Sequence, residues 1–146
     1  MKKASTDLLL LDVNVLLGIA WPNHQFHAAA VAALSSQSRW ATCALTQLGF
    51  IRLSSNSAAV ATAKSPGAAA GLLARLVADS LHVYLASLPA PASEGWRDAL
   101  DAVLGHQQVT DAYLLRLAAA HDAVLVTFDR RLESLANGMA KVMVLT

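Results

Sequence analysis

The chain has 146 residues, of which 55% are hydrophobic and only 14% are charged, and its formal net charge is +1. This length is typical of one domain with a full core, and with 5% aromatic residues that core must consist mostly of Ala, Leu and Val. The balanced charge excludes a strong overall attraction to nucleic acid or membrane surfaces, so any contact with a polyanion has to come from a local patch.

The single cysteine, Cys43, excludes an intramolecular disulfide framework and a cysteine-based zinc site. We expect it to pack as a small apolar residue. The first apolar run soon meets Asp12 and Asn14, which a secretory signal would not normally contain. Since no stretch reaches the roughly 18 uninterrupted apolar residues of a membrane span, we expect a soluble, cytoplasmic protein without membrane contact.

The first half of the chain alternates short apolar runs with helical patterns. We predict strands at 8–11 and 40–43 and helices at 13–20, 24–36 and 45–53. In the last of these helices, Leu45, Leu48 and Ile51 are expected to face inward, with Phe50 as a further candidate. Residues 54–67 are rich in Ser and Ala and contain Pro66-Gly67, which favours a mobile connection.

The second half continues the alternation. We predict a helix at 68–78, a strand at 82–85, a helix from the N-cap Ser93 toward Leu104, a helix at 111–120 behind the N-cap Thr110, strands at 124–127 and 141–145, and a short helix at 130–135 between these strands. Strands that alternate with helices indicate an α/β fold with a mostly parallel central sheet in a three-layer α/β/α sandwich. We expect one domain that spans residues 1–146.

Three aspartates lie at the ends of apolar elements. Asp12 follows the run of four leucines, Asp129 follows the strand that ends near Thr127, and Asp111 opens a helix. The carboxyl ends of parallel strands border the ligand-binding crevice of an open α/β sheet, so the three side chains are expected to converge there. Converged carboxylates repel one another, which favours a hard divalent cation between them.

Each aspartate also has a purely structural interpretation. Asp12 is a good N-cap, and Asp111 suits the first turn of a helix because of the helix dipole. Asp129 is also suited to a cap, or to an ion pair with Arg130 or Arg131. Taken one at a time, the structural interpretation of Asp12 is the more common one.

The order of the segments around these acids carries more information. Leu10-Leu11-Asp12-Val13-Asn14, Leu45-Thr46-Gln47-Leu48-Gly49-Phe50, Val109-Thr110-Asp111-Ala112-Tyr113-Leu114 and Leu125-Val126-Thr127-Phe128-Asp129 resemble, in this order, the motifs of PIN-domain ribonucleases. The pattern is most similar to the VapC-type toxins of bacterial toxin–antitoxin pairs. Each motif alone is weak, but the ordered set covers almost the whole chain.

This resemblance implies an endoribonuclease that depends on Mg²⁺ or Mn²⁺ and cleaves RNA with a water molecule activated by the cation. It implies that Asp12, Asp111 and Asp129 are the metal ligands and catalytic residues, together with Gln47. Supporting roles are expected for Asn14, Thr46, Thr127 and Arg130. The implied partners are the RNA substrate, a cognate antitoxin protein and a second copy of the chain in a homodimer.

Gln47 departs from the family pattern, which usually has a Glu directly after the Thr of the middle segment. An amide keeps an oxygen that can bind a metal or water, but it carries no charge and cannot act as a general base. The alternative hypothesis is therefore a catalytically impaired PIN fold that binds RNA or a partner. Gln47 could also simply face the solvent from its helix.

The remaining candidates have structural interpretations that are at least as good. His24 and His27 have a spacing that would place them on one helix face, but packed rings are favoured over a metal site. Trp96 beside Arg97 is favoured as a helix-packing residue over a base-stacking one. A phospho-acceptor receiver would need a paired acid at the end of the first strand and an earlier lysine than Lys141. A phosphatase-like domain would need a second Asp where this chain has Asn14, so both rank far behind.

Overall fold

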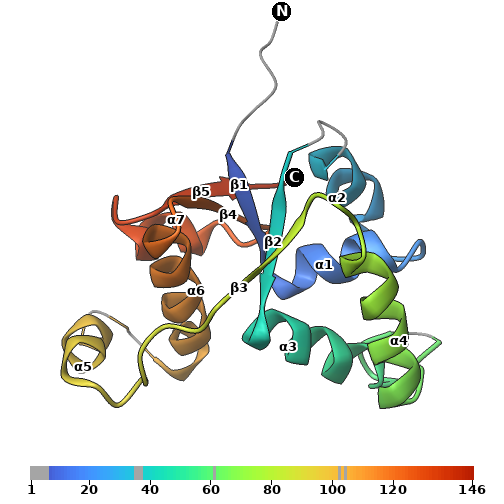
Figure 1. Cartoon of the computed structure of the whole chain (residues 1–146), viewed down its shortest axis with the longest axis horizontal. Coiled ribbons are helices and arrows are strands. Elements are labelled where there is room, and N and C mark those ends of the chain that lie inside the picture. Colours follow the sequence, from blue (N-terminus) through green and yellow to red (C-terminus); the bar gives the residue numbers. More distant parts are fainter. Residues whose placement is uncertain (1–6, 35–37, 61, 102, 104) are drawn as a thin grey trace, which may run out of the picture.

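The computed structural model describes every residue except 1–6, 35–37, 61, 102 and 104 (Figure 1). Its centre is a five-stranded sheet in the order β3-β2-β1-β4-β5, and every neighbouring pair of strands is parallel. The strands are β1 (Leu8–Leu11), β2 (Trp40–Cys43), β3 (His82–Leu85), β4 (Ala123–Thr127) and β5 (Lys141–Val144). The predicted parallel sheet is confirmed.

Helices cover both faces of the sheet, which gives the three predicted layers. The first group lies on one face and the last group on the other (Figure 1). The first group is α1 (Val13–Ala20), α2 (His27–Leu34), α3 (Ala44–Ser54) and α4 (Pro66–Val77), and the last is α5 (Glu94–Leu100), α6 (Val109–Ala120) and α7 (Arg131–Ala136). A short 3₁₀ turn, His106–Gln108, leads into α6.

The central strands are hydrophobic on both sides because both faces are covered. In β1, the side chain of Leu10 packs in one core with Leu114 and Leu117 of α6. Its neighbours Leu9 and Leu11 point the other way, into a second core that contains Phe50 of α3. This alternation follows from the two-residue period of a strand and explains why the leucine run is uninterrupted.

The strand order reverses between β1 and β4, and this reversal positions the candidate site. The chain moves from β1 to β2 and β3 on one side, and then returns to place β4 and β5 on the other side. In the register of the pair, Leu11 is opposite Val126, and the backbone N–H of Asp12 donates to the Val126 carbonyl at 2.9 Å. Open α/β sheets bind ligands at such a reversal, outside the carboxyl ends of the strands.

The predicted helix at 24–36 begins later than expected, at His27. Nδ1 of His24 accepts a hydrogen bond from the backbone N–H of Phe26, and the N–H of His27 donates to the His24 carbonyl. These bonds form turns ahead of the helix, so His24 and His27 do not share a helix face. The predicted end of this helix lies at residues 35–36, outside the described residues.

The inward face of α3 also differs from the prediction. The buried side chains are Thr46, Phe50 and Ser54, which recur every four residues and so form one stripe. Leu48 lies on the opposite side and is 65% exposed. The prediction that Leu48 faces the core is therefore wrong, while the alternative candidate, Phe50, is fully buried.

Two helix starts were misassigned from the sequence. Pro66 and Gly67 begin α4 rather than belonging to a mobile connection, because the hydroxyl of Ser65 accepts the N–H of Ala68 and Pro is well suited to the first helical position. Thr110 is not an N-cap, since the 3₁₀ turn continues directly into α6 at Val109.

Helix α5 follows Ser93 as predicted but ends at Leu100. Part of its predicted extension, residues 102 and 104, lies outside the described residues. In the part of the chain that the structure describes, no helix is both long and apolar enough to cross a membrane.

A pair of Leu→Ala variants tests the layer assignment. Leu125 of β4 is fully buried, so Leu125→Ala is expected to lower the free energy of unfolding by about 2–5 kcal/mol. The matched variant Leu48→Ala should change it by no more than about 0.5 kcal/mol, because this side chain is in water. Urea unfolding measures both, and a loss at Leu48 as large as that at Leu125 would contradict the burial described above.

Candidate acidic site at the carboxyl edge of the sheet

Asp12 is the most buried of the candidate acids, with an exposed fraction of 9%. It follows β1 and is the N-cap of α1, where its Oδ1 accepts the backbone N–H of Val13 at 2.7 Å. Its Oδ2 accepts the hydroxyl of Thr127 at 2.8 Å. Burial raises the pKa of Asp12 above its usual value, although the two hydrogen bonds work against this rise. Asp12 is thus both the N-cap of α1 and a member of the candidate site.

Thr127 links the ends of two elements. It is fully buried at the end of β4. Its hydroxyl oxygen accepts a hydrogen bond from the backbone N–H of Asp129 at 3.1 Å, and the same hydroxyl donates a hydrogen bond to Asp12. A single hydroxyl therefore holds the first acid and also fixes the backbone that carries the last one. The sequence analysis placed Thr127 near the acids, and the geometry agrees.

Asp111 extends the acidic group from α6, whose first turn contains it. Its pKa is raised to about 6, first by burial and then by the charges of Asp12 and Asp129, with a smaller opposing effect of Arg131. Asp111 also lines one small pocket together with Asp129 and Arg131, and Thr127 joins Asp129 to Asp12. The structure therefore brings together the three aspartates that the sequence singled out.

Asp129 differs from the other two because it has a cationic partner. Its carboxylate accepts hydrogen bonds from the backbone N–H of Arg131 at 2.9 Å, from Nε at 3.0 and 3.2 Å, and from the terminal NH2 nitrogen at 2.8 Å. The Arg131 side chain lowers the pKa of Asp129 below its usual range. Arg131, rather than Arg130, is therefore the arginine that contacts the acids.

The three carboxylates are chemically suited to a hard cation, but their oxygens are not yet arranged around one ion position. Carboxylate oxygens are the ligands that Mg²⁺ and Mn²⁺ prefer, and a cation would relieve the repulsion that raises the pKa of Asp111. Among the described residues, however, no three His, Cys, Asp or Glu side chains are grouped closely enough to hold a metal ion as they stand. Asp129, engaged by Arg131, is the member whose oxygens would have to be released.

Gln47 is partly buried in α3, and its amide has a partner on β2. Its Nε2 donates to Oγ1 of Thr42 at 3.0 Å, and the same oxygen lies 2.7 Å from Nε2 of His82 on β3. Gln47 is thus not simply a solvent-facing helix residue. Its turn packs close to α1, since a Cβ on Gly49 would lie 3.0 Å from Cγ2 of Val13, the residue after Asp12.

The other predicted supporting residues lie around this edge without contacting the carboxylates. Thr46 is buried and its hydroxyl bonds to the backbone of Cys43, which caps α3. Asn14 is exposed in the first turn of α1, and Arg130 is exposed at the start of α7. Trp96 is buried and stacks on Tyr113 at 5.5 Å between ring centroids, so it is a packing residue as favoured.

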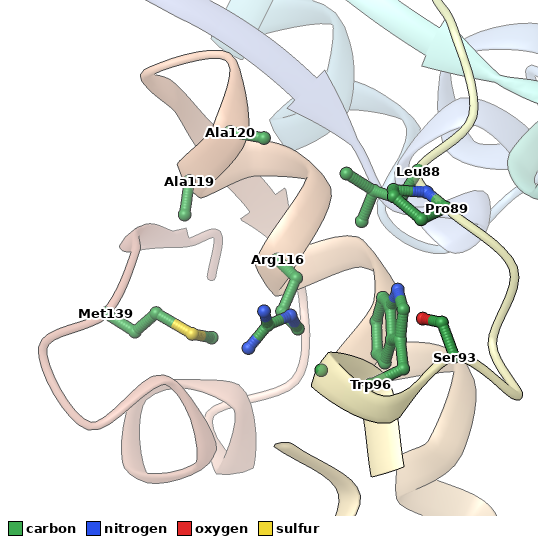
Figure 2. Close-up of a pocket in the computed structure, with 9 residues that line it drawn as sticks. Leu88, Pro89, Ser93, Trp96, Arg116, Ala119, Ala120 and Met139 are labelled. Carbon is green, nitrogen blue, oxygen red and sulfur yellow. The ribbon is translucent and has the colours of Figure 1, made fainter. Parts of the chain in front are cut away.

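A cavity also lies away from the three aspartates. It has a volume of about 470 Å³ and opens near the C-terminal end of α6, where Trp96, Arg116 and Met139 line it (Figure 2). None of the three aspartates contributes to it. We take the acidic edge as the candidate site, because a large cavity alone does not show chemistry whereas clustered acids with shifted pKa values do.

Sequence reasoning missed Thr42 and His82. The only signal for Thr42 was a hydroxyl within a buried strand, and the only signal for His82 was a polar residue at the start of the next strand. Both are general features of sheets, so only the folded structure reveals that Thr42 contacts Gln47 on one side and His82 on the other.

The raised pKa of Asp111 predicts a pH-dependent stability. Its carboxyl has a pKa of about 6 in the folded protein and about 3.9 when unfolded, so the folded state binds more protons between these values. Its stabilising contribution is complete below about pH 4 and is lost as the pH rises through about 6. Urea unfolding at pH 4.5 and pH 7.5 should therefore show a smaller pH-dependent loss in Asp111→Asn than in the wild type. Equal slopes would contradict the shift.

Comparison with known proteins agrees with this geometry. Residues 9–138 match the PIN domain family. Ribonuclease VapC39 of Mycobacterium tuberculosis (strain ATCC 25618 / H37Rv) is 38% identical over 137 residues, which cover 92% of this chain and 98% of that protein. Ribonuclease VapC44 of the same strain is 39% identical over 123 residues, covering 83% and 85% of the two chains.

Solved structures match the fold. The VapBC2 structure from Rickettsia felis, bound to a promoter DNA fragment, contains a chain that aligns with a TM-score of 0.64 at 12% identity, covering 95% of this chain and 99% of that one. A chain of VapBC-1 from nontypeable Haemophilus influenzae aligns with a TM-score of 0.59 at 14% identity, covering 94% and 97%. With a family match over most of its length and relatives more than 30% identical, this chain belongs to the PIN domain family and, within it, to the VapC-type proteins.

Proposed function

We propose that this protein is a divalent-metal-dependent endoribonuclease that acts as the toxin of a toxin–antitoxin pair. The observation that carries this proposal is the placement of three aspartates beside the strand-order reversal of a VapC-type PIN domain: Thr127 joins Asp12 to the backbone of Asp129, and Asp111 lines one small pocket with Asp129. Relatives that are named ribonucleases match this chain over nearly their full length, which supports RNA as the substrate.

The three aspartates would hold the ion, which we propose to be Mg²⁺ or Mn²⁺. A bound divalent ion supplies charge compensation for the phosphoryl oxygens and lowers the pKa of the attacking water. The chain's own residues supply the positioning: Thr127 and the Val13 N–H hold Asp12, and Thr127 also holds the backbone of Asp129. Removal of these hydrogen bonds would let the carboxylates separate under their mutual repulsion.

Asp111 is the acid with the most unusual protonation. Its pKa of about 6 means that some of the protein carries a proton there near neutral pH. Binding of a cation would favour the ionised form, so ion binding should release a proton from this group. A site of this kind is expected to bind metal more tightly as the pH rises.

The proposed partners are an antitoxin protein and a second copy of the chain. The matching solved structures are VapBC assemblies, which supports an antitoxin for this chain as well. Leu48 on α3 and Val109 on α6 are exposed apolar side chains that a protein partner could cover. A toxin that acts on RNA would work in the cytoplasm.

The acidic site is tested by an isosteric substitution. Asp12→Asn removes one charge but keeps the size of the side chain, and it should lower the rate of RNA cleavage with Mg²⁺ or Mn²⁺ by about 100-fold or more. Asp122→Asn is the matched control, because Asp122 is exposed and precedes β4 at the opposite end of that strand from Thr127, and this variant should cleave as the wild type does. Denaturing gel electrophoresis of a total RNA digest measures both. Undiminished cleavage by Asp12→Asn would remove the site assignment.

Gln47→Glu separates the enzyme from a catalytically impaired binding module. A fourth carboxylate near the site should strengthen Mn²⁺ binding about tenfold, because it adds a charged oxygen ligand, and should leave cleavage at least as fast as in the wild type. Calorimetry and the same cleavage assay measure these effects. If only Gln47→Glu cleaves RNA while the wild type binds it intact, the chain is the binding module instead.

A further inference from the structure

Arg131 donates hydrogen bonds to both oxygens of the Asp129 carboxylate. An ionised carboxylate has about four lone-pair positions. Oδ1 accepts the backbone N–H and Nε of Arg131, and Oδ2 accepts Nε and a terminal NH2 nitrogen, all within 2.8–3.2 Å. The single Nε–H is shared between the two oxygens, so three N–H groups of Arg131 point at this carboxylate, and a cation that binds Asp129 has to compete with them.

The pair is also easy to break. The Arg131 side chain is 74% exposed and that of Asp129 is 31% exposed, and this pair is the salt bridge found in the described part of the chain. Exposed ion pairs contribute little to stability, since water solvates both partners when they separate. Little free energy is therefore needed to separate the guanidinium of Arg131 from the acidic edge.

Arg131 is well suited to a second partner. A guanidinium presents paired N–H donors that match the oxygens of a phosphate as well as those of a carboxylate. Arg131 is the first residue of α7, beside the edge where an RNA phosphate would meet the three acids. Without a nearby cation, those carboxylates would repel the phosphate.

We propose that Arg131 is a substrate-positioning residue that exchanges partners: it occupies Asp129 in the free protein and moves to an RNA phosphate when substrate binds, which opens Asp129 to the divalent ion. This inference rests on the proposed ribonuclease function. It has a thermodynamic consequence, because a group that blocks the ion in the absence of RNA and binds the RNA in its presence couples the two equilibria. RNA and the ion should each strengthen the binding of the other by the same factor.

The consequence gives Arg131→Gln two effects of opposite sign. Without RNA, Mn²⁺ should bind about threefold to fivefold more tightly than in the wild type, because the competing guanidinium is gone. Without metal, in EDTA, a random-sequence single-stranded RNA of about 20 nucleotides should bind more weakly. The slope of log affinity against log salt should fall by about 0.7, the value for one lost phosphate contact on a single strand.

Two matched variants separate direct contact from a general loss of charge. Arg130→Gln removes a neighbouring exposed guanidinium that makes no hydrogen bond to Asp129 in the described structure, and Mn²⁺ affinity should stay within about twofold of the wild type. Arg131→Lys keeps the charge but lacks the planar fork, so its Mn²⁺ affinity should lie between those of the wild type and Arg131→Gln. Calorimetry measures the ion and fluorescence anisotropy the RNA.

The outcomes distinguish this inference from the proposed function. If wild type and Arg131→Gln bind Mn²⁺ equally, or if Arg130→Gln tightens it as much, the exchange of partners is wrong while the ribonuclease proposal stands. If the wild type binds neither Mn²⁺ nor RNA, the proposed function itself fails and the inference fails with it. Tighter ion binding together with weaker RNA binding, in Arg131→Gln but not in Arg130→Gln, is the result expected.

Discussion

The hydrogen bond between Thr127 and Asp12 is the contact on which the acidic site depends. It joins residues 115 positions apart in the sequence, and it exists only because β1 and β4 are neighbours in register, with Leu11 opposite Val126. A slip of one residue would turn Thr127 to the other face of the sheet. The buried leucine and valine side chains that fix the register therefore also position the chemistry.

Magnitudes indicate which interactions hold the charge. A hydrogen bond to a charged group contributes about 1.5–3 kcal/mol, and Asp12 accepts two of them, from Val13 and Thr127. An exposed ion pair contributes about 0–1 kcal/mol. The hydrogen bonds of Asp12, and not the exposed Asp129–Arg131 pair, therefore offset the cost of burying the Asp12 carboxylate. The pair matters because it places the positive charge of Arg131 beside the acids. One guanidinium offsets one of three carboxylate charges, which leaves the site acidic enough to attract a cation.

The sequence predicted the parallel sheet because the sheet depends on local patterns, and the same patterns placed the three aspartates at the ends of elements. Apolar runs in β1, β2 and β4 identify buried strands, and parallel strands bring their carboxyl ends together whatever their side chains are. What failed depends on tertiary geometry. Leu48 was assigned to the core because an apolar residue in a helix does not reveal which side of that helix packs inward. Thr110 was assigned as a cap because the 3₁₀ turn before α6 has no distinct pattern in the sequence.

The contacts of Gln47 also depend on tertiary geometry and could not be predicted from the sequence. They give a structural reason for a glutamine where the family usually has a glutamate. His82 has a lowered pKa, mainly because of burial, so it is neutral near pH 7. With the His82 proton on Nδ1, the hydrogen bonds run in one direction: Gln47 donates to Thr42, and Thr42 donates to His82. In this direction the amide nitrogen of Gln47 is the group that is bound to β2.

A glutamate at position 47 would reverse that direction, because a carboxylate only accepts hydrogen bonds. Thr42 would then have to donate to it, and His82 would have to donate to Thr42 from Nε2, which requires the other tautomer or the protonated ring. The amide is therefore matched to its two neighbours on β2 and β3. The glutamine at position 47 is thus accounted for by its own hydrogen bonds to the sheet, and its proposed role beside the three aspartates stays a prediction that Gln47→Glu tests.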